Sequence, residues 1–177
     1  MRLTVIVMGV SGTGKSTVAE GVARALGLAC IEGDDLHSPA NVEKMRQGTP
    51  LTDADRWPWL DRVGAALADA AAAPAGAVAS CSALRRVYRD RLRAACPGLR
   101  FVFLDGCENL IAARMRQRSG HYMPTTLLTS QLQTLEHPGA DEVVCSVGTE
   151  TAEDENQSSH QRFLSMFIRS KVPERTD

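Results

Sequence analysis

The sequence predicts an α/β fold in which helices flank a central parallel β-sheet of about five strands. Short apolar runs alternate along the 177 residues with helical patterns, and this alternation is typical of parallel strands joined by helical crossovers. The first run, Leu3–Met8, contains four consecutive β-branched residues, as expected for a strand buried on both faces. Because a chain of this length suits one domain, we expect residues 1–177 to form a single domain.

Capping signals locate two helices in the first half of the chain. Ser38 followed by Pro39 is typical of an N-cap and the first helical position, and Thr52 with Asp55 resembles a capping box. The alanine-rich stretch near residue 73 favours helix, because alanine has the highest helix propensity. In chain order, we expect strands over 3–8, 29–31, 77–82, 99–104 and 143–147, and helices that end near residues 27, 48 and 73 and span 84–95, 109–118, 125–135 and 162–169.

The charges of the chain nearly cancel but are unevenly distributed. Lys and Arg number 20 against 21 Asp and Glu, which argues against a nucleic-acid partner held by a broad basic surface. Residues 85–118 hold nine Arg and three acids, whereas residues 136–155 hold seven acids and no basic residue.

No segment of the sequence indicates that the protein crosses a membrane or is secreted. No apolar run approaches the ~20 residues needed to cross a bilayer, and the five cysteines include no Cys-x-x-Cys pair. We therefore expect reduced thiols, no membrane partner and a cytoplasmic location.

Residues 9–16, GVSGTGKS, fit the G-x-x-x-x-G-K-[ST] pattern of a phosphate-binding loop, or P-loop. Glycines allow positive φ, so that backbone N–H groups turn inward around a polyphosphate. The following helix directs its N-terminal dipole at the same anion, while Lys15 reaches the β- and γ-phosphates and Ser16 is placed to bind Mg²⁺. The residues expected to bind ATP are Gly9, Ser11, Gly12, Thr13, Gly14, Lys15, Ser16 and Thr17.

P-loop proteins usually need an acid from another strand near Mg²⁺, and the sequence offers two positions for it. Asp105 ends an apolar strand, but the Asp-Gly pair there is equally typical of a turn. The other candidates follow the second strand, whose carboxyl end faces the same crevice as the P-loop in an open α/β sheet. There, Glu32 and Asp34 are expected to project to one side, with Asp35 opposite.

The absence of one motif narrows the class of P-loop protein. No Asn-Lys-x-Asp sequence, which normally recognises guanine, occurs, so a GTPase is disfavoured. The chain is also short for a motor or transporter ATPase. A small kinase and a P-loop regulator remain. We interpret Trp57 and Trp59 as packing residues rather than as the wall of a ligand site.

Clustered arginines suggest how a kinase of this kind stabilises transferred phosphate. A lid over about 114–136 would close cations over the phosphates and exclude water, although arginines at a helix end also complement its dipole. In the preceding basic helix, one or two arginines are expected to reach an anionic substrate, with the others solvated. The arginines in question are Arg114, Arg116 and Arg118 in the lid, and Arg85, Arg89 and Arg93 on one face of the basic helix.

Several strings together resemble the gluconokinase family, small P-loop kinases related to shikimate and nucleoside-monophosphate kinases. They are MGVSGTGKST at 8–17, GDDLH at 33–37, NVEKM at 41–45, PLTDADRWPWL at 50–60, CSALRR at 81–86, YRD at 88–90, GHYM at 120–123, SQLQTLE at 130–136 and ADE at 140–142. The resemblance covers residues 5–142 and implies a P-loop kinase fold with a helical lid. It also implies that MgATP phosphorylates the 6-hydroxyl of D-gluconate, giving 6-phosphogluconate for the pentose phosphate pathway.

The resemblance further implies roles for individual residues. Asp34 would lie beside the acceptor hydroxyl as general base or orienting group, and Ser16 would bind Mg²⁺, with Glu32 or Asp34 as further candidate ligands. A homodimer is implied as well. The catalytic residues would be Lys15, Asp34 and Arg118. The gluconate site would be lined by Asp34, His37, Arg56, Cys81, Ser82, Arg85 and the lid residue His121.

The resemblance fades after residue 142. The stretch 148–161 is long, polar and acidic, so the residues that contact adenine are not assigned. Two alternatives to a gluconate kinase stay open: a kinase for another small acceptor, such as shikimate or a related sugar acid, and a non-catalytic nucleotide-binding regulator.

Overall fold

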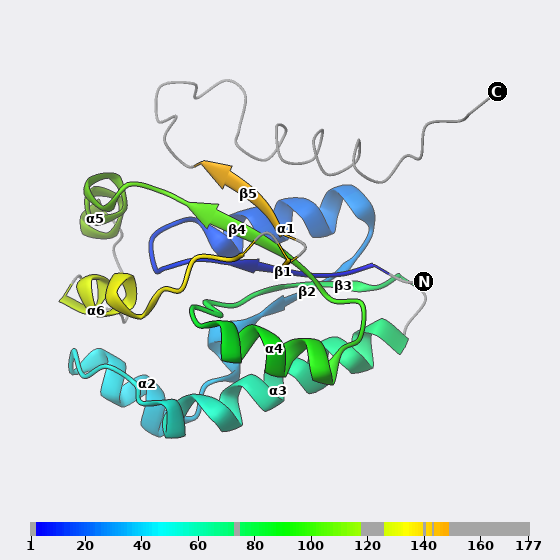
Figure 1. Ribbon diagram of the computed structural model, residues 1–177, viewed down its shortest axis with the longest axis horizontal. Coiled ribbons are helices and arrows are strands. Elements are labelled where there is room, and N and C mark those ends of the chain that lie inside the picture. The colour runs from blue at the N-terminus through cyan, green and yellow to red at the C-terminus, as the bar shows by residue number, and fades with distance from the viewer. Residues whose placement is uncertain (1–2, 73–74, 118–125, 140, 143, 149–177) are drawn as a thin grey trace.

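The described residues form a five-stranded parallel sheet with helices on both faces (Figure 1). The computed structural model describes residues 3–72, 75–117, 126–139, 141–142 and 144–148. The order across the sheet is β2-β3-β1-β4-β5, and every adjacent pair is parallel, which confirms the predicted α/β fold. The strands are β1 (Thr4–Met8), β2 (Ala29–Glu32), β3 (Ala77–Ser80), β4 (Arg100–Asp105) and β5 (Val144–Gly148).

The helices connect the strands and close both faces of the sheet. In Figure 1, α1 lies on one side of the sheet, α3 and α4 lie on the other, and α5 and α6 lie beyond the carboxyl ends of the strands. The helix predicted over 162–169 lies outside the described residues. The helical elements are α1 (Lys15–Leu26), the 3-10 helix η1 (Gly33–Leu36), α2 (Pro39–Arg46), α3 (Asp53–Ala72), α4 (Arg86–Ala95), α5 (Glu108–Gln117) and α6 (Thr126–Thr134).

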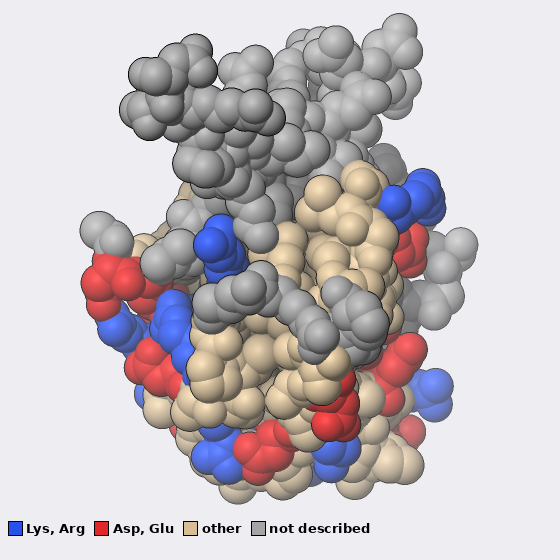
Figure 2. Space-filling model, turned by 90° about the vertical axis from the view of Figure 1, so that its right-hand side faces the viewer, with Lys and Arg blue, Asp and Glu red and all other residues tan. Residues whose placement is uncertain are grey.

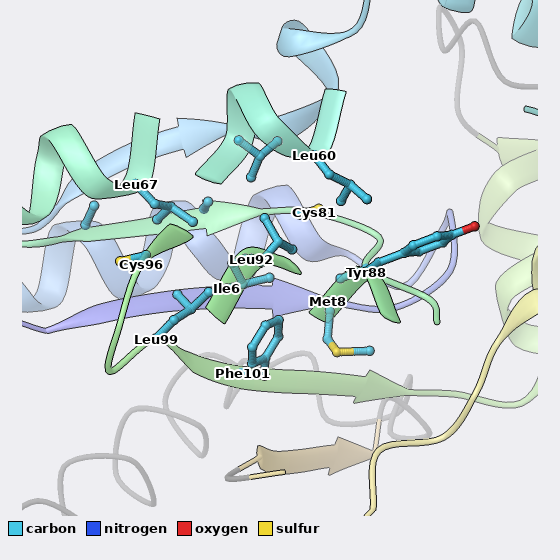
Figure 3. Packing of buried hydrophobic residues seen from close by; sticks show 14 of the residues in the cluster. Ile6, Met8, Leu60, Leu67, Cys81, Tyr88, Leu92, Cys96, Leu99 and Phe101 are labelled. Atoms are coloured by element: carbon cyan, nitrogen blue, oxygen red, sulfur yellow. The ribbon is translucent and has the colours of Figure 1, made fainter. Parts of the chain in front are cut away.

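The central strand β1 explains why the sheet needs helices on both faces. Successive side chains of a strand point to opposite faces. Val5 and Val7 belong to the apolar cluster that includes α1, whereas Ile6 and Met8 belong to the cluster that includes α3 and α4 (Figure 3). All four side chains are fully buried. The side chains of this strand are therefore used in packing, and we expect functional groups in the loops at the strand ends.

Local capping signals predicted two helix starts correctly. The Ser38 hydroxyl accepts a hydrogen bond from the Asn41 N–H at 3.2 Å. Thr52 and Asp55 form the capping box, because each side chain accepts the backbone N–H of the other residue. These contacts satisfy N–H groups that a helix start otherwise leaves unpaired.

Predicted boundaries are wrong at the carboxyl end of β2 and of β3. After Glu32 the chain turns into η1, so the strand alternation expected for Glu32 and Asp34 does not apply. Strand β3 ends at Ser80 rather than at residue 82, and α4 begins at Arg86 rather than at residue 84. Ala83 has a φ of 43°, and this left-handed conformation separates the strand from the helix.

The expectation that the arginines of α4 reach a substrate or are solvated is wrong for Arg89. This side chain is 0% exposed, and its Nε and Nη2 atoms donate to the two carboxylate oxygens of Glu142 at 2.7 and 2.8 Å. The Glu142 side chain is only 1% exposed. Hydrogen bonds from Arg89 hold the pKa of Glu142 down to about 2. Among the described residues, three further ion pairs join α4 and its N-cap residue to the segment 136–142: Arg85–Glu136, Arg86–Asp141 and Arg93–Glu142.

Ion pairs at the surface differ from the Arg89–Glu142 pair because their side chains are exposed to water. Arg91 donates to both carboxylate oxygens of Asp61 at 2.6 and 2.8 Å, but both side chains are exposed. On the face drawn in Figure 2, basic and acidic side chains are interspersed rather than gathered by sign. Among the described residues, none of the helices has both the length and the apolar character to cross a membrane.

The buried pair predicts a large difference in stability between two matched substitutions. Glu142→Gln leaves the Arg89 charge buried without its counter-charge, so the free energy of unfolding should fall by about 3–5 kcal/mol. Asp61→Asn removes the partner of an exposed arginine on the same helix, where water replaces the lost contact, and should change little. Urea unfolding of both variants tests this, and equal effects would contradict it.

Candidate active site

The P-loop lies between β1 and α1, as its sequence predicts. Gly9 has a φ of 145°, and a Cβ atom there would lie 2.8 Å from the Leu104 carbonyl oxygen. Gly14 has a φ of 90° and forms the N-cap of α1. Within the loop, Lys15 Nζ donates to the Val10 carbonyl at 3.1 Å. Glycine is thus required both for close approach to β4 and for the left-handed turn that begins the helix.

One cavity lies beside the P-loop, at the carboxyl ends of β2 and β3. The P-loop contributes Ser11 and Lys15 to its wall. This is the place where open α/β sheets bind ligands. The remaining lining residues are Asp34, His37, Met45, Pro50, Leu51, Arg56, Trp59, Ser82, Leu84, Leu127, Ser130 and Gln131.

Asp34 is held in this wall by contacts between β2 and β3. The Glu32 carboxylate accepts from the Asp34 N–H at 3.4 Å and from the Ser80 hydroxyl. The Gly33 N–H in turn donates to the Ser80 hydroxyl at 3.2 Å. A Cβ atom on Gly33 would lie 2.1 Å from the Ser80 carbonyl oxygen, so only glycine fits there. Of the candidate acids at the end of β2, Asp34 lines the cavity and Glu32 does not.

His37 presents an uncharged ring to the cavity. Its imidazole stacks on the Trp59 indole, with the ring centroids 4.3 Å apart and the planes 13° from parallel. Trp59 is fixed in turn, because its Nε1 donates to the Gly33 carbonyl at 2.7 Å. Burial, followed by the charges of Arg62 and Arg56, lowers the pKa of His37 from 6.5 to about 4. The ring is therefore neutral near pH 7, and its buried Nδ1 has no hydrogen-bond partner among the described residues.

Arg56 is positioned by a small polar cluster at the edge of the cavity. Its Nη1 donates to the Tyr88 hydroxyl at 3.3 Å, and that hydroxyl donates to Asp53. The Tyr88 ring borders the apolar core while its oxygen points away from it (Figure 3). Arg85 also donates to Asp53, at 2.6 Å. The hydrogen bond from Tyr88 and the Arg85 charge lower the pKa of Asp53, so this carboxylate stays ionised beside both arginines.

The structure separates the residues that the sequence analysis placed in the substrate wall. Ser82 lines the cavity with Asp34, His37 and Arg56. Cys81 does not: it is buried among core residues (Figure 3), and burial raises the pKa of its thiol to about 12. Arg85 also lies outside the lining, bonded to Asp53 and Glu136.

The predicted lid is only partly described. Residues 118–125, which include Arg118 and His121, lie outside the described residues, and their role stays a prediction. Within α5, Arg116 Nε donates to the Ala112 carbonyl at 3.2 Å. Asp105, one of the candidate acids for magnesium, is exposed at the end of β4 and does not line the cavity.

Sequence reasoning missed the contribution of α6 to the cavity. Leu127, Ser130 and Gln131 of this helix line the cavity together with Asp34 and His37. Trp59, interpreted as a packing residue, is indeed buried but also reaches the cavity beneath His37. The string SQLQTLE lies within the predicted lid, but none of its residues was assigned to the cavity, because that contact depends on the fold.

Comparisons with known proteins agree with this geometry. A family model described as "AAA domain" matches residues 4–138. The chain is 53% identical over 149 residues to the gluconokinase of Gluconobacter oxydans (strain 621H), with 84% of each sequence covered. A solved gluconokinase from Sinorhizobium meliloti 1021 is 45% identical, with a TM-score of 0.79 over 96% of this chain and 97% of that chain. A solved, unliganded sugar kinase from Janibacter sp. HTCC2649 is 42% identical, with a TM-score of 0.86 over 95% of each chain.

The lowered pKa of His37 predicts a pH dependence of stability. Between pH 6.5 and about 4 the unfolded chain binds a proton at this ring that the folded chain does not, so acidification through this window lowers the free energy of unfolding. In His37→Gln this contribution is absent, and the fall over the window should be smaller. His137→Gln, which replaces an exposed histidine, should behave like the unaltered chain. Denaturant unfolding at several pH values measures the slopes, and identical slopes for all three proteins would refute the assignment.

Proposed function

We propose that this chain, which belongs to the gluconokinase family, transfers the γ-phosphate of ATP to the 6-hydroxyl of D-gluconate. The observation that carries the proposal is the convergence of Lys15, Asp34 and Arg56 on one cavity. Lys15 supplies a cation from the P-loop, Asp34 a carboxylate for a hydroxyl proton, and Arg56 a cation for a carboxylate. A sugar acid has both a hydroxyl and a carboxylate, and therefore uses all three.

Asp34 is the residue beside the attacking hydroxyl in this proposal. As the hydroxyl oxygen bonds to the γ-phosphorus, the bond from that phosphorus to the leaving oxygen of ADP breaks, and Asp34 orients the hydroxyl and takes its proton. Negative charge spreads over the transferred group, where Lys15 and the P-loop N–H groups stabilise it. Positioning and charge supply most of the catalysis, which suits a site with one carboxylate and several fixed donors.

Recognition of gluconate rests on the contrast between a charged and a neutral part of the wall. The guanidinium of Arg56 is held by Tyr88, so little side-chain freedom is lost when it binds a carboxylate. His37 and Ser82 offer uncharged hydrogen-bonding groups that suit the hydroxyls of the sugar chain. The family resemblance points to the same residues.

Mg²⁺ fits the P-loop end of this site. Ser16 is the second residue of α1, directly after Lys15, and this hydroxyl position binds the ion in P-loop proteins. Mg²⁺ keeps several waters and uses phosphate oxygens, so it needs few protein ligands. This agrees with the described residues, which contain no cluster of three or more His, Cys, Asp or Glu side chains able to hold a metal. When bound, the ion would offset charge on the phosphate oxygens. Of the two acids that the family resemblance implies as further ligands, Asp34 lines the cavity and Glu32 does not.

The first test is ADP release with and without gluconate. Lys15→Met and Asp34→Asn should each abolish gluconate-dependent release, because one loses the phosphate cation and the other the proton acceptor. Asp35→Asn is the matched control, since Asp35 is exposed and does not line the cavity, and it should retain turnover.

The same assay distinguishes the alternatives. Substantial turnover by Asp34→Asn would remove the base assignment. Release with shikimate or another sugar acid, but not with gluconate, would change the substrate. Tight ATP binding without transfer to any acceptor would indicate a regulator.

Arg56 provides a second test, of substrate recognition. Arg56→Gln removes a hydrogen-bonded cation facing the carboxylate, so KM for gluconate should rise by about 10- to 100-fold with a smaller change in kcat. Arg91→Gln, which removes an exposed arginine outside the cavity, should leave both constants unchanged. Steady-state kinetics measure them, and an unchanged KM in Arg56→Gln would exclude this residue from carboxylate binding.

A further inference from the structure

The P-loop is hydrogen-bonded to α6 through a single glutamine. Gln131 Oε1 accepts from the Ser11 N–H at 2.7 Å, and Gln131 Nε2 donates to the Ser11 hydroxyl at 3.3 Å. A primary amide is suited to this arrangement, because it provides an acceptor and a donor side by side. The two contacts join residues 120 positions apart in sequence, so they fix the third residue of the P-loop against a distant helix.

Helix α6 is itself packed into the wall of the acceptor cavity. Leu128 and Leu132 belong to an apolar cluster with Val10 of the P-loop, whereas Leu127 packs with Met45 and Leu51 on the far side of the cavity. Gln131 follows Leu127 by four residues and so lies on the same face of the helix, and both side chains line the cavity. The helix therefore spans from the P-loop to the part of the wall formed by α2 and the segment after it.

Ser11 occupies the boundary between the two halves of the site. It is buried, it belongs to the P-loop, and it lines the acceptor cavity beside Lys15 and Asp34. The side chain and N–H that Gln131 holds are thus on the part of the P-loop that faces the acceptor. A displacement of about 1 Å between reacting groups costs on the order of 100-fold in rate, so this contact is in a position to matter for transfer.

We propose that Gln131 is a positioning residue that aligns the P-loop with the acceptor cavity, so that phosphate is transferred to the acceptor rather than to water. This inference rests on the proposed function. Gln131 acts through Ser11 and α6 and takes no proton itself. Its loss should therefore impair the transfer step more than the binding of either substrate.

The test compares Gln131→Met with Gln133→Met. Methionine keeps the length of the side chain and removes both hydrogen bonds, and Gln133 is an exposed residue of the same helix that does not line the cavity. Gln131→Met should lower gluconate-dependent kcat by about 10- to 100-fold, with KM for ATP and for gluconate changed less than about 3-fold. Gln133→Met should match the unaltered chain.

A second readout separates alignment from general damage to the fold. ADP release without gluconate reports transfer to water, and the ratio of gluconate-dependent to gluconate-independent release should fall in Gln131→Met. A variant that is merely less folded loses both rates in proportion and keeps the ratio. Circular dichroism checks folding; if Gln131→Met does not fold, Ser11→Ala removes the same Nε2–Oγ hydrogen bond from the other side and should lower the ratio in the same direction.

The outcomes distinguish this inference from the proposed function. A normal ratio and kcat in the folded variant overturn the role of Gln131 while gluconate kinase activity stands. Absence of gluconate-dependent release by the unaltered chain overturns the proposed function, and this inference with it.

Discussion

The buried pair between Arg89 and Glu142 is the interaction on which the walls of the site depend. Besides its bonds to Glu142, Arg89 Nη1 donates to the carbonyls of Ala83 and Leu84 at 3.2 and 3.1 Å, so one guanidinium holds the turn that follows Ser82. Glu142 also accepts from the Gly139 N–H at 3.0 Å, which fixes the segment after α6. The buried charge of Arg89 is tolerated because its guanidinium bonds to a carboxylate and to two backbone carbonyls. Both side chains of the pair are almost fully buried.

This pair helps to explain the uneven charge distribution in the sequence, with its basic block at residues 85–118 and its acidic block at residues 136–155. Four arginines of the basic block bond to acids of the acidic block, and the acids are Glu136, Asp141 and Glu142. These described arginines and acids are 49 or more positions apart in sequence, and the fold brings them into contact. Helix α4, which was expected to supply substrate-binding cations, therefore uses most of its arginines in structural ion pairs. The arginine that lines the cavity, Arg56, comes instead from α3, outside the basic block.

Sequence predicted the parts of the site that local chemistry determines. The P-loop follows from a pattern of glycines within eight residues, and the N-cap of α2 and the capping box of α3 join residues three apart, so all could be recognised without the fold. The failures share another cause. Glu32 bonds to Ser80 and Gln131 bonds to Ser11, so both depend on a residue 48 or more positions away in sequence. Cys81 packs in the core because the fold covers its side of the strand end. Periodicity contains no information on such contacts.

The electrostatics of the cavity explain why a neutral histidine belongs among cations. Lys15 and Arg56 already favour anions, and a third positive charge in the same cavity would strengthen the attraction for polyanions. Burial, followed by the nearby charges of Arg62 and Arg56, lowers the pKa of His37 and keeps its ring uncharged. A neutral imidazole offers one N–H donor and one nitrogen acceptor, and a hydroxyl group, which both donates and accepts, can pair with either of them. The same burial that lowers the stability of the folded chain in acid thus favours an acceptor with a single carboxylate and several hydroxyls.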